Sequence, residues 1–453
     1  KILLQKKLMV LIKNKIKIKI LKPIDVTQNY LKWFKDHDIK KYVINTKYKN
    51  INQLKNYVQN NVKKKNCVFL GIFLKNKHIG NLKFEKINIK KKTSVMGILI
   101  GEKKYRNQGF SLNALLQGMT LLNKNYNIRY FWLGVNKKNI PAIHLYKKAG
   151  FRIIKEKKQD YMMLRDFRLL NLSRLSLGTA QLGMKYGINN RFGKIKINEA
   201  KNIVNYCEKL GIRSIDTAIS YGNAEKILGK IGIKNFKITS KLPYIEYEKI
   251  KDIEKMVKSS IKNLKIRKLN CLLIHSSKNI EKNTFLILNK MKELKLKGLV
   301  SEIGISITKF HDIYKIVNNY NFDVIQLPYN IIDRRFESQK IMNLFKKKKI
   351  KIQIRSIFLQ GLLFKKYPEI PSFLKVHSSD LLKFRDFLSK SKSTKLSYML
   401  NFVYRNQFPK NYIFGIDGLK QLKDIAKIKI NNKLNFNGLK SSDENLINPS
   451  YWN

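Results

Sequence analysis

Residues 214–222, Ser-Ile-Asp-Thr-Ala-Ile-Ser-Tyr-Gly, contain a short apolar strand that runs directly into polar side chains. Seven further stretches between residues 171 and 430 share this pattern, and helical segments of about 10–15 residues separate them. The eight predicted strands are Leu175–Thr179, Ser214–Thr217, Lys237–Lys241, Cys271–His275, Glu302–Ser306, Val324–Tyr329, Ile352–Phe358 and Tyr412–Ile416. Eight βα units over roughly 250 residues predict a (β/α)8 TIM barrel.

Upstream of the barrel, residues 16–167 follow a different order of elements. A half-buried strand is followed by short helices, a hairpin and then strand, helix, strand, with Ser94–Ile100, Phe110–Asn123 and Tyr130–Val135 as the last three. This order predicts a separate α+β domain. The fold class is therefore α/β in two domains, 16–167 and 171–430, with a C-terminal tail at 431–453.

The charge of the chain is extreme, because its 453 residues carry 94 Lys and Arg against 30 Asp and Glu, a net charge of +64. Such a charge would suit a protein that binds nucleic acid. However, most of the basic residues are Lys, they are spread along the whole chain, and Asn and Ile, which also have AT-rich codons, are frequent. Readers of base sequence favour Arg. We therefore expect no specific nucleic-acid partner, although the field would attract anionic small molecules.

The cysteines and the apolar runs indicate the compartment. Cys67, Cys207 and Cys271 lie far apart, form no metal-ligand spacing and predict no disulfide framework. No apolar run reaches the roughly 18–20 residues that a membrane-spanning helix needs. We expect a cytoplasmic protein without a metal site.

Polar side chains follow three consecutive barrel strands, where the active sites of such barrels lie. Asp216 and Tyr221 follow the second strand, Lys241 ends the third and His275 ends the fourth. A tyrosine can protonate a carbonyl oxygen when a nearby lysine lowers its pKa. Asp216 would hold Lys241 charged and oriented, and His275 would hydrogen-bond the substrate oxygen.

In this order the four residues resemble the catalytic tetrad of the aldo/keto reductase superfamily, which implies NADP(H) or NAD(H) as cofactor. By the same resemblance, Ser306 and Gln326 bind the nicotinamide carboxamide, and Gly415 and Gln421 lie in the region that meets the cofactor phosphate.

Three positions depart from the pattern of that superfamily. Ile307 replaces an asparagine, and Arg355 stands where an aromatic ring usually stacks on the nicotinamide. Asp417 stands where many members have a basic residue for the 2′-phosphate. A carboxylate there would repel that phosphate and accept a ribose hydroxyl, so the usual preference for NADPH is weakened.

The first domain contains a possible phosphate-binding loop, Arg106-Asn107-Gln108-Gly109-Phe110-Ser111, between a strand and a helix. Backbone N–H groups at such a junction bind pyrophosphate. After the strand Tyr130–Val135, Asn139 can cap a helix with Pro141 in its first turn. Ala142 and Tyr146 share one face of that helix, and Gly150 ends it.

Together these motifs resemble the GNAT superfamily of acetyl-CoA-dependent N-acetyltransferases. The resemblance implies that the loop from Arg106, chiefly Gln108, Gly109, Phe110 and Ser111, cradles the CoA pyrophosphate. It also implies that Asn139 contacts the cofactor, that Tyr146 protonates the departing thiolate, and that the strand Ser94–Ile100 splays from its neighbour to admit the pantetheine. The base that deprotonates the acceptor amine stays open between a water relay and the side chains of Glu85, Glu102, His78 and His144.

The opening of the chain, from Asn29 to Phe34 and from Asp38 to Val43, more loosely resembles acetyltransferases that act on nucleotide-linked amino-deoxysugars. An acetyltransferase and a carbonyl reductase on one chain suit neighbouring steps of surface-glycan sugar biosynthesis, and residues 355–363 resemble reductases of such gene clusters. Two alternatives remain, a bifunctional enzyme for unrelated small molecules and a basic nucleic-acid-binding protein.

Overall fold

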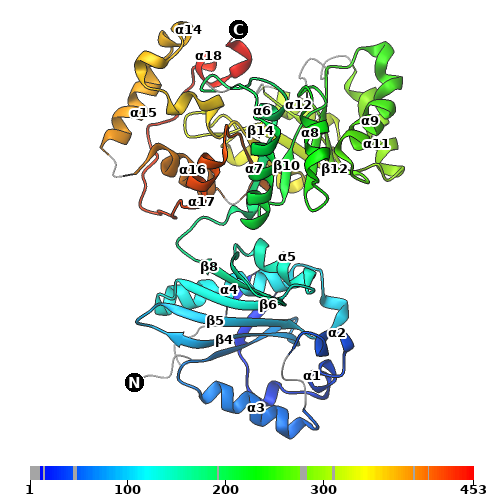
Figure 1. The fold of residues 1–453 in the computed structure, drawn as a ribbon, viewed down its shortest axis with the longest axis vertical. Coiled ribbons are helices and arrows are strands. Elements are labelled where there is room, and N and C mark those ends of the chain that lie inside the picture. The colour runs from blue at the N-terminus through cyan, green and yellow to red at the C-terminus, as the bar shows by residue number, and fades with distance from the viewer. Residues whose placement is uncertain are drawn as a thin grey trace. The chain divides into compact units, whose positions relative to one another are not determined.

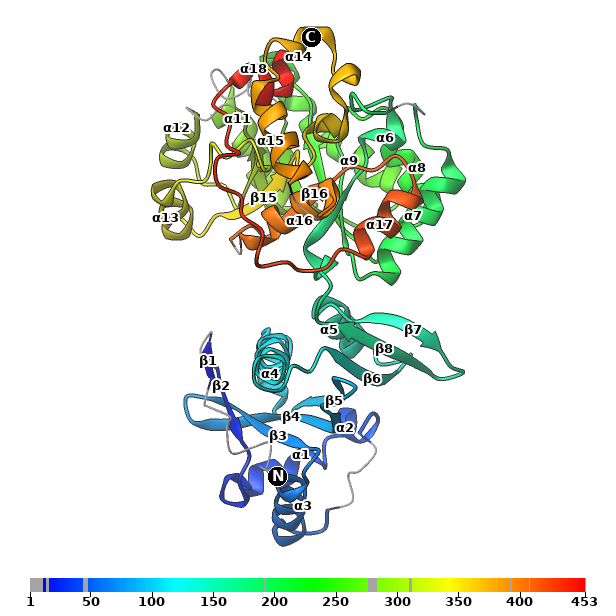
Figure 2. The ribbon, with the colours of Figure 1, turned by 90° about the vertical axis from the view of Figure 1, so that its left-hand side faces the viewer.

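The computed structural model describes residues 11–13, 16–43, 48–190, 193–275, 283–308, 312–390, 393–406 and 408–452. The chain divides into two compact units, Lys1–Ser173 and Arg174–Asn453 (Figures 1 and 2). Each unit has its own sheet and is described by itself.

The first unit is built on a mixed sheet with the strand order β1-β2-β3-β4-β5-β6-β8-β7. Its strands are β1 (Leu11–Lys13), β2 (Ile16–Ile20), β3 (Val68–Leu74), β4 (Lys77–Asn88), β5 (Thr93–Ile100), β6 (Tyr130–Asn136), β7 (Arg152–Glu156) and β8 (Asp160–Asp166). Its helices are α1 (Gln28–Trp33), α2 (His37–Lys40), α3 (Ile51–Lys63), α4 (Phe110–Tyr126) and α5 (Ile140–Lys148).

Two apolar cores hold this unit together, one on each face of the sheet. Leu54 and Val58 of α3 pack with Tyr30 and Trp33 of α1 on one face. On the other face, α4 and α5 bury side chains such as Leu115 among inward-facing residues of the strands. Figures 1 and 2 both show α1 and α3 on one side of the sheet and α4 and α5 on the other.

The parallel neighbours β5 and β6 pair only over Thr93–Val95 and Tyr130–Trp132. Beyond this point β5 continues to Ile100 and β6 to Asn136 without pairing to each other. The expected splay between these two strands is therefore present, and it leaves an opening within the sheet.

The second unit is a closed barrel of parallel strands in the order β10-β11-β12-β13-β14-β15-β16-β9. The strands are β9 (Leu175–Gly178), β10 (Ser214–Asp216), β11 (Lys237–Leu242), β12 (Leu269–Ile274), β13 (Val300–Ser306), β14 (Val324–Pro328), β15 (Lys351–Arg355) and β16 (Asn411–Phe414). This confirms the predicted fold class. The seventh strand ends at Arg355 rather than at Phe358, because Ser356 adopts a positive φ of 58° that an extended strand does not allow.

Helices follow the strands around the barrel, and short helices complete its rim. They are α6 (Ala180–Gly183), α7 (Ile197–Lys209), α8 (Ala224–Ile231), α9 (Ile253–Leu264), α11 (Thr284–Leu296), α12 (Asp312–Asn319), α13 (Gln339–Lys347), α14 (Ser372–Lys375), α15 (Ser379–Ser389), α16 (Lys395–Arg405), α17 (Leu419–Ala426) and α18 (Glu444–Ile447).

The segment after α17 is packed onto the barrel, where Leu446 and Ile447 of α18 are fully buried. Among the residues that the structure describes, no helix is both long and apolar enough to cross a membrane. The same residues contain no group of three or more His, Cys, Asp or Glu placed to hold a metal ion.

Candidate active sites

The four predicted catalytic residues of the barrel come from three adjacent strands. Asp216 is the last residue of β10, and Lys241 lies near the end of β11. His275 directly follows β12, and Tyr221 lies in the loop after β10. Because parallel strands place their carboxyl ends on one rim, these side chains converge there.

Lys241 and Asp216 form a buried ion pair, with 2.5 Å between Nζ and Oδ1. Lys241 Nζ also donates to the carbonyl oxygen of Thr217 at 2.9 Å. Burial lowers the pKa of Lys241, but the negative charge of Asp216 and the hydrogen bond to it help to outweigh that effect and hold the pKa above its ordinary value. Lys241 is therefore a fixed cation beneath the rim.

Tyr221 lies between Lys241 and His275. Lys241 Nζ is 5.2 Å from the centroid of the Tyr221 ring, and the rings of Tyr221 and His275 meet edge to face at 5.7 Å. Burial, with the charges of Lys241 and Arg355, lowers the pKa of His275 to about 3. His275 is therefore neutral at physiological pH and can donate only one ring N–H.

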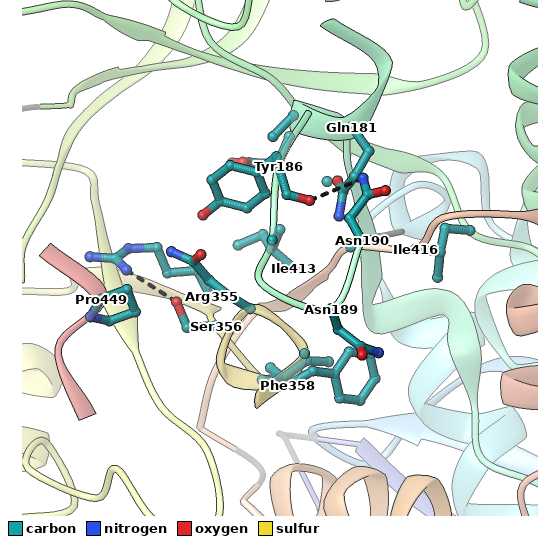
Figure 3. A pocket seen from close by; sticks show the side chains of 18 of the residues that line it. Gln181, Tyr186, Asn189, Asn190, Arg355, Ser356, Phe358, Ile413, Ile416 and Pro449 are labelled. Carbon is teal, nitrogen blue, oxygen red and sulfur yellow. Dashed lines mark hydrogen bonds between the residues drawn. The ribbon is translucent and has the colours of Figure 1, made fainter. Parts of the chain in front are cut away.

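A cavity of about 600 Å³ opens above these residues (Figure 3). It is lined by the predicted catalytic residues Asp216, Tyr221 and His275. Lys241 does not line the cavity and contacts it through its ion pair with Asp216. All six predicted cofactor-binding residues of the barrel also line it, namely Ser306, Gln326, Arg355, Gly415, Asp417 and Gln421. The structure thus gathers the barrel residues singled out from the sequence around one cavity.

Gln326 on β14 connects the catalytic ion pair to the barrel interior. Its Nε2 donates to Asp216 Oδ2 at 2.8 Å and to Gln353 Oε1 at 3.1 Å. Ser306 Oγ donates to Gln326 Oε1 at 3.4 Å. Gln326 therefore positions the carboxylate of Asp216.

Arg355 reaches from β15 to the end of β13. Its guanidinium donates to Ser306 Oγ at 3.3 Å, to the Ile307 carbonyl at 3.2 Å and to Thr308 Oγ1 at 2.8 Å. Burial lowers the pKa of Arg355. These contacts fix the guanidinium of Arg355 in the cavity wall.

Carboxylates surround the beginning of α17. Asp417 is half-buried, and burial raises its pKa, although a hydrogen bond from Gln421 partly opposes this. The N–H of Leu419, the first residue of α17, donates to Glu199 Oε1 at 2.7 Å. A helix N-terminus favours an anion. At the N-terminus of α17, this anion is the carboxylate of Glu199.

The predicted pyrophosphate loop of the first unit contains two residues with positive φ, Asn107 at 62° and Gly109 at 82°. A Cβ on Gly109 would meet no atom within 4 Å. The space above the loop is therefore open, and the N–H groups that begin α4 at Phe110 and Ser111 are available to an anion.

The side chains at the start of this loop have local partners. Arg106 donates to Asp36 at 2.9 Å and to the Gly101 carbonyl at 2.9 Å, so it ties the end of β5 to α2. Gln108 Nε2 donates to the Lys104 carbonyl. The part of the loop open to a phosphate is thus its backbone rather than these two side chains.

The predicted cofactor contacts Asn139 and Tyr146 lie at the beginning of α5 and within it. Asn139 Oδ1 accepts the N–H of Ala142 at 3.2 Å, so the side chain caps α5 as expected. Tyr146 is buried against Phe151, and burial raises its pKa to about 12. A phenol with this pKa keeps its proton at neutral pH and can donate it.

The four candidate bases differ in what surrounds them. Lys83 pairs with Glu85, and Lys77 pairs with Glu102. His78 lies among aromatic rings, its Nε2 donates to Asn81 Oδ1 at 2.9 Å, and burial lowers its pKa. His144 is an exposed residue of α5. The structure therefore leaves the water relay and these side chains open.

The barrel geometry, a buried Asp–Lys pair below a Tyr and a neutral His, coincides with a family match. The aldo/keto reductase family matches residues 174–435. The chain belongs to this family. Its first unit contains a GNAT acetyltransferase domain, matched over residues 19–152.

Solved structures of aldo-keto reductases resemble the barrel. One from Pseudomonas aeruginosa is 19% identical, covers 56% of this chain and 88% of its own, and gives a TM-score of 0.43. The holo form of one from Bacillus halodurans is 19% identical, covers 57% of this chain and 94% of its own, and gives a TM-score of 0.47. No match was found among curated proteins.

Several residues that line the reductase cavity were not predicted from the sequence. They come from the loops after β9 and from the C-terminal segment, and include Gln181, Tyr186, Asn190 and Asn448. Gln181, Tyr186 and Asn190 follow β9, but they share no motif with Asn448 or with the other site residues, so the sequence pattern did not single them out.

Proposed function

We propose that the reductase domain interconverts a carbonyl group and an alcohol with NADPH or NADH, and that the first domain transfers acetyl groups from acetyl-CoA to an amino group. The observation that carries the first activity is the convergence of Asp216, Lys241, Tyr221 and His275 beside one cavity. The reduced nicotinamide, when bound, supplies the hydride.

The chain's own residues supply the proton. Tyr221 donates it from its hydroxyl group to the substrate oxygen, and the fixed charge of Lys241 stabilises the phenolate that remains. Asp216 holds Lys241 in place. His275, being neutral, orients the substrate oxygen through a hydrogen bond without competing for the proton.

The cavity is large enough to hold a ligand of cofactor size. Ser306 and Gln326 offer hydroxyl and amide groups to a carboxamide. Asp417 and the cap that Glu199 provides for α17 disfavour a 2′-phosphate. We therefore expect NADH to be used at least as readily as this family's usual NADPH.

In the acetyltransferase domain, the support comes from the open loop at Gly109 and the splay of β5 from β6. The loop backbone suits the CoA pyrophosphate, and the splay exposes strand edges to the pantetheine. Tyr146, which retains its proton at neutral pH, donates it to the thiolate as this leaves.

The acceptor we propose is the amino group of a nucleotide-linked amino-deoxysugar, in surface-glycan biosynthesis in the cytoplasm. The loose resemblance of the N-terminal residues supports this acceptor, as does the fusion of two chemistries that such pathways use. The strongly basic chain would also attract the diphosphate of such a substrate.

A panel of nucleotide amino-sugars, incubated with acetyl-CoA and followed by mass spectrometry, tests the acceptor. We expect the mass of one acetyl group to be added to at least one panel member. Free amino-sugars and simple amines serve as controls for the role of the nucleotide. Acetylation of simple amines alone would support the alternative of an enzyme for unrelated small molecules.

A further inference from the structure

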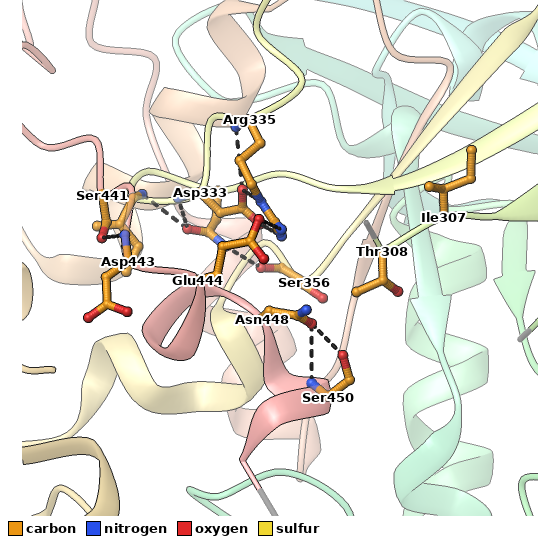
Figure 4. A network of polar contacts seen from close by, with 12 residues as sticks. Ile307, Thr308, Asp333, Arg335, Ser356, Ser441, Asp443, Glu444, Asn448 and Ser450 are labelled. Atoms are coloured by element: carbon orange, nitrogen blue, oxygen red, sulfur yellow. Dashed lines mark hydrogen bonds and ion pairs between the residues drawn. The ribbon is translucent and has the colours of Figure 1, made fainter. Parts of the chain in front are cut away.

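The C-terminal segment 436–452 lies beyond the part of the chain that matches the aldo/keto reductase family, yet it forms part of the cavity wall. Polar contacts hold it in place, and Figure 4 shows part of this network around Ser441, Glu444 and Arg335. Ser441 N–H donates to the Ile332 carbonyl at 2.9 Å, Asp443 pairs with His377 at 2.8 Å, and Glu444 lies 3.5 Å from Arg335. The segment therefore holds its side chains in defined positions.

Within this segment, Asn448 lines the cavity and is only 1% exposed. Its Oδ1 accepts hydrogen bonds from Ser450, from the backbone N–H at 3.3 Å and from Oγ at 2.5 Å. Its Nδ2 is buried and has no partner among the residues that the structure describes. Because an unpaired buried donor is costly, the amide of Asn448 has a hydrogen bond still to make.

The charged side chains near Asn448 indicate the charge of the ligand group that would accept its hydrogen bond. Arg355 lines the same cavity, and among the residues that the structure describes its guanidinium donates to hydroxyl and carbonyl oxygens rather than to a carboxylate. The buried carboxylates that face it are already paired, Asp216 with Lys241 and Asp333 with Arg335. A guanidinium with no carboxylate of its own and an unpaired amide donor together suit an anionic oxygen group.

Other side chains that line the cavity are also suited to an anionic group. Thr308 and Ser356 add hydroxyl groups to the same cavity, and in the view of Figure 3 Arg355, Ser356 and Pro449 lie on the opposite side from Gln181 and Ile416. Of the three acidic residues that line the cavity, Asp216 is paired with Lys241, and Asp417 and Asp424 belong to the region around α17.

We propose that Asn448 is a substrate-binding residue of the reductase, whose Nδ2 donates a hydrogen bond to an acidic group, a carboxylate or a phosphate, on the carbonyl substrate. The inference rests on the proposed reductase function and names its substrate class. Asn448 thereby gives the C-terminal segment a part in selecting the substrate.

The test compares two aldehydes of similar size, 4-carboxybenzaldehyde and the neutral 4-nitrobenzaldehyde, in the full chain. Asn448→Asp keeps the Oδ1 acceptor that Ser450 needs but replaces the amide donor by a carboxylate. The matched control is Asn445→Asp, the same change at an exposed position of the same segment. Asn445 makes its hydrogen bonds to Asp443 and Trp452 through its backbone.

We expect Asn448→Asp to lower kcat/KM for 4-carboxybenzaldehyde by at least about tenfold, the loss typical of a hydrogen bond to a charged group. The value for 4-nitrobenzaldehyde should change less than about threefold, and Asn445→Asp should change neither. An equal loss on both aldehydes would mean that Asn448 has only a structural role, and would overturn the proposal.

Binding of 4-carboxybenzoate, measured by calorimetry with and without the oxidised cofactor, tests the subsite without turnover. We expect Asn448→Asp to weaken this binding by at least about tenfold. Binding that is unaffected by Asn448→Asp, or no binding to the wild type, would overturn the proposal. If the wild type bound 4-carboxybenzoate but reduced neither aldehyde, the proposed reductase function would fail while the subsite stood.

Discussion

Replacing Asp417 by asparagine should shift the cofactor preference of the reductase toward NADPH. The 2′-phosphate of NADPH carries up to two negative charges, and each repels a carboxylate about 4 Å away by about 1 kcal/mol in water. Asp417 is half-buried, so the repulsion is at least of this size. The sum, about 2 kcal/mol, corresponds to a change of roughly 30-fold in the ratio of dissociation constants. Asp417→Lys should increase the shift further.

The pH dependence follows from the raised pKa of Asp417. Below that pKa the carboxyl is neutral and repels nothing, so discrimination against NADPH should weaken as the pH falls through it and grow as the pH rises. The shift caused by Asp417→Lys should also shrink with added salt, because screening acts on exposed charges. Glu199 should keep some discrimination in every Asp417 variant, since its carboxylate still caps α17.

The assay is a fluorescence titration of NADH and NADPH against wild type, Asp417→Asn and Asp417→Lys, at low and high salt. Asp386→Asn is the control, because Asp386 is an exposed residue of α15 whose carboxylate pairs with Lys390. A ratio that changes by less than about threefold in both Asp417 variants would refute the reasoning, and would mean that Asp417 does not face the ribose.

Four further substitutions test the two sites. Tyr221→Phe should lower reduction at least 100-fold while nicotinamide binding persists, and full turnover would reject the assignment of the tetrad. Tyr146→Phe should slow acetylation but leave the dissociation constant of acetyl-CoA, measured by calorimetry, nearly unchanged, unless the tyrosine holds the cofactor instead. Gly109→Val should weaken CoA binding at least about tenfold, because a branched side chain would fill the open loop; Gly232→Val, at another glycine of positive φ, is the control for strain. Gly183→Ala should destabilise the barrel by about 2 kcal/mol and impair reduction but not acetyl transfer, because its Cβ would lie 1.7 Å from the Tyr221 carbonyl oxygen, and an unchanged melting transition would contradict this.

Much of the fold could be predicted because it depends on local patterns. Strand periodicity located the eight barrel strands within a few residues, and a parallel barrel brings strand ends together, so Asp216, Lys241 and His275 could be placed without knowledge of their neighbours. The splay of β5 from β6 was expected on other grounds, from the resemblance of the first domain to GNAT acetyltransferases.

Other features depend on contacts between residues far apart in sequence, which a pattern cannot reveal. Glu199 reaches the beginning of α17 across 220 positions. Arg106 was expected at the phosphate, but its guanidinium joins Asp36 and the end of β5. Asn448 lies in a segment that showed no motif, and only its burial beside the cavity makes it noticeable.

The buried pair of Asp216 and Lys241 also limits how this chain can change. Removing one partner would leave an uncompensated charge in the barrel interior, at a cost of about 3–5 kcal/mol. A single substitution at either position would therefore destabilise the barrel as well as break the ion pair. Among the 94 basic residues of this chain, Lys241 is thus one whose charge the barrel interior itself requires.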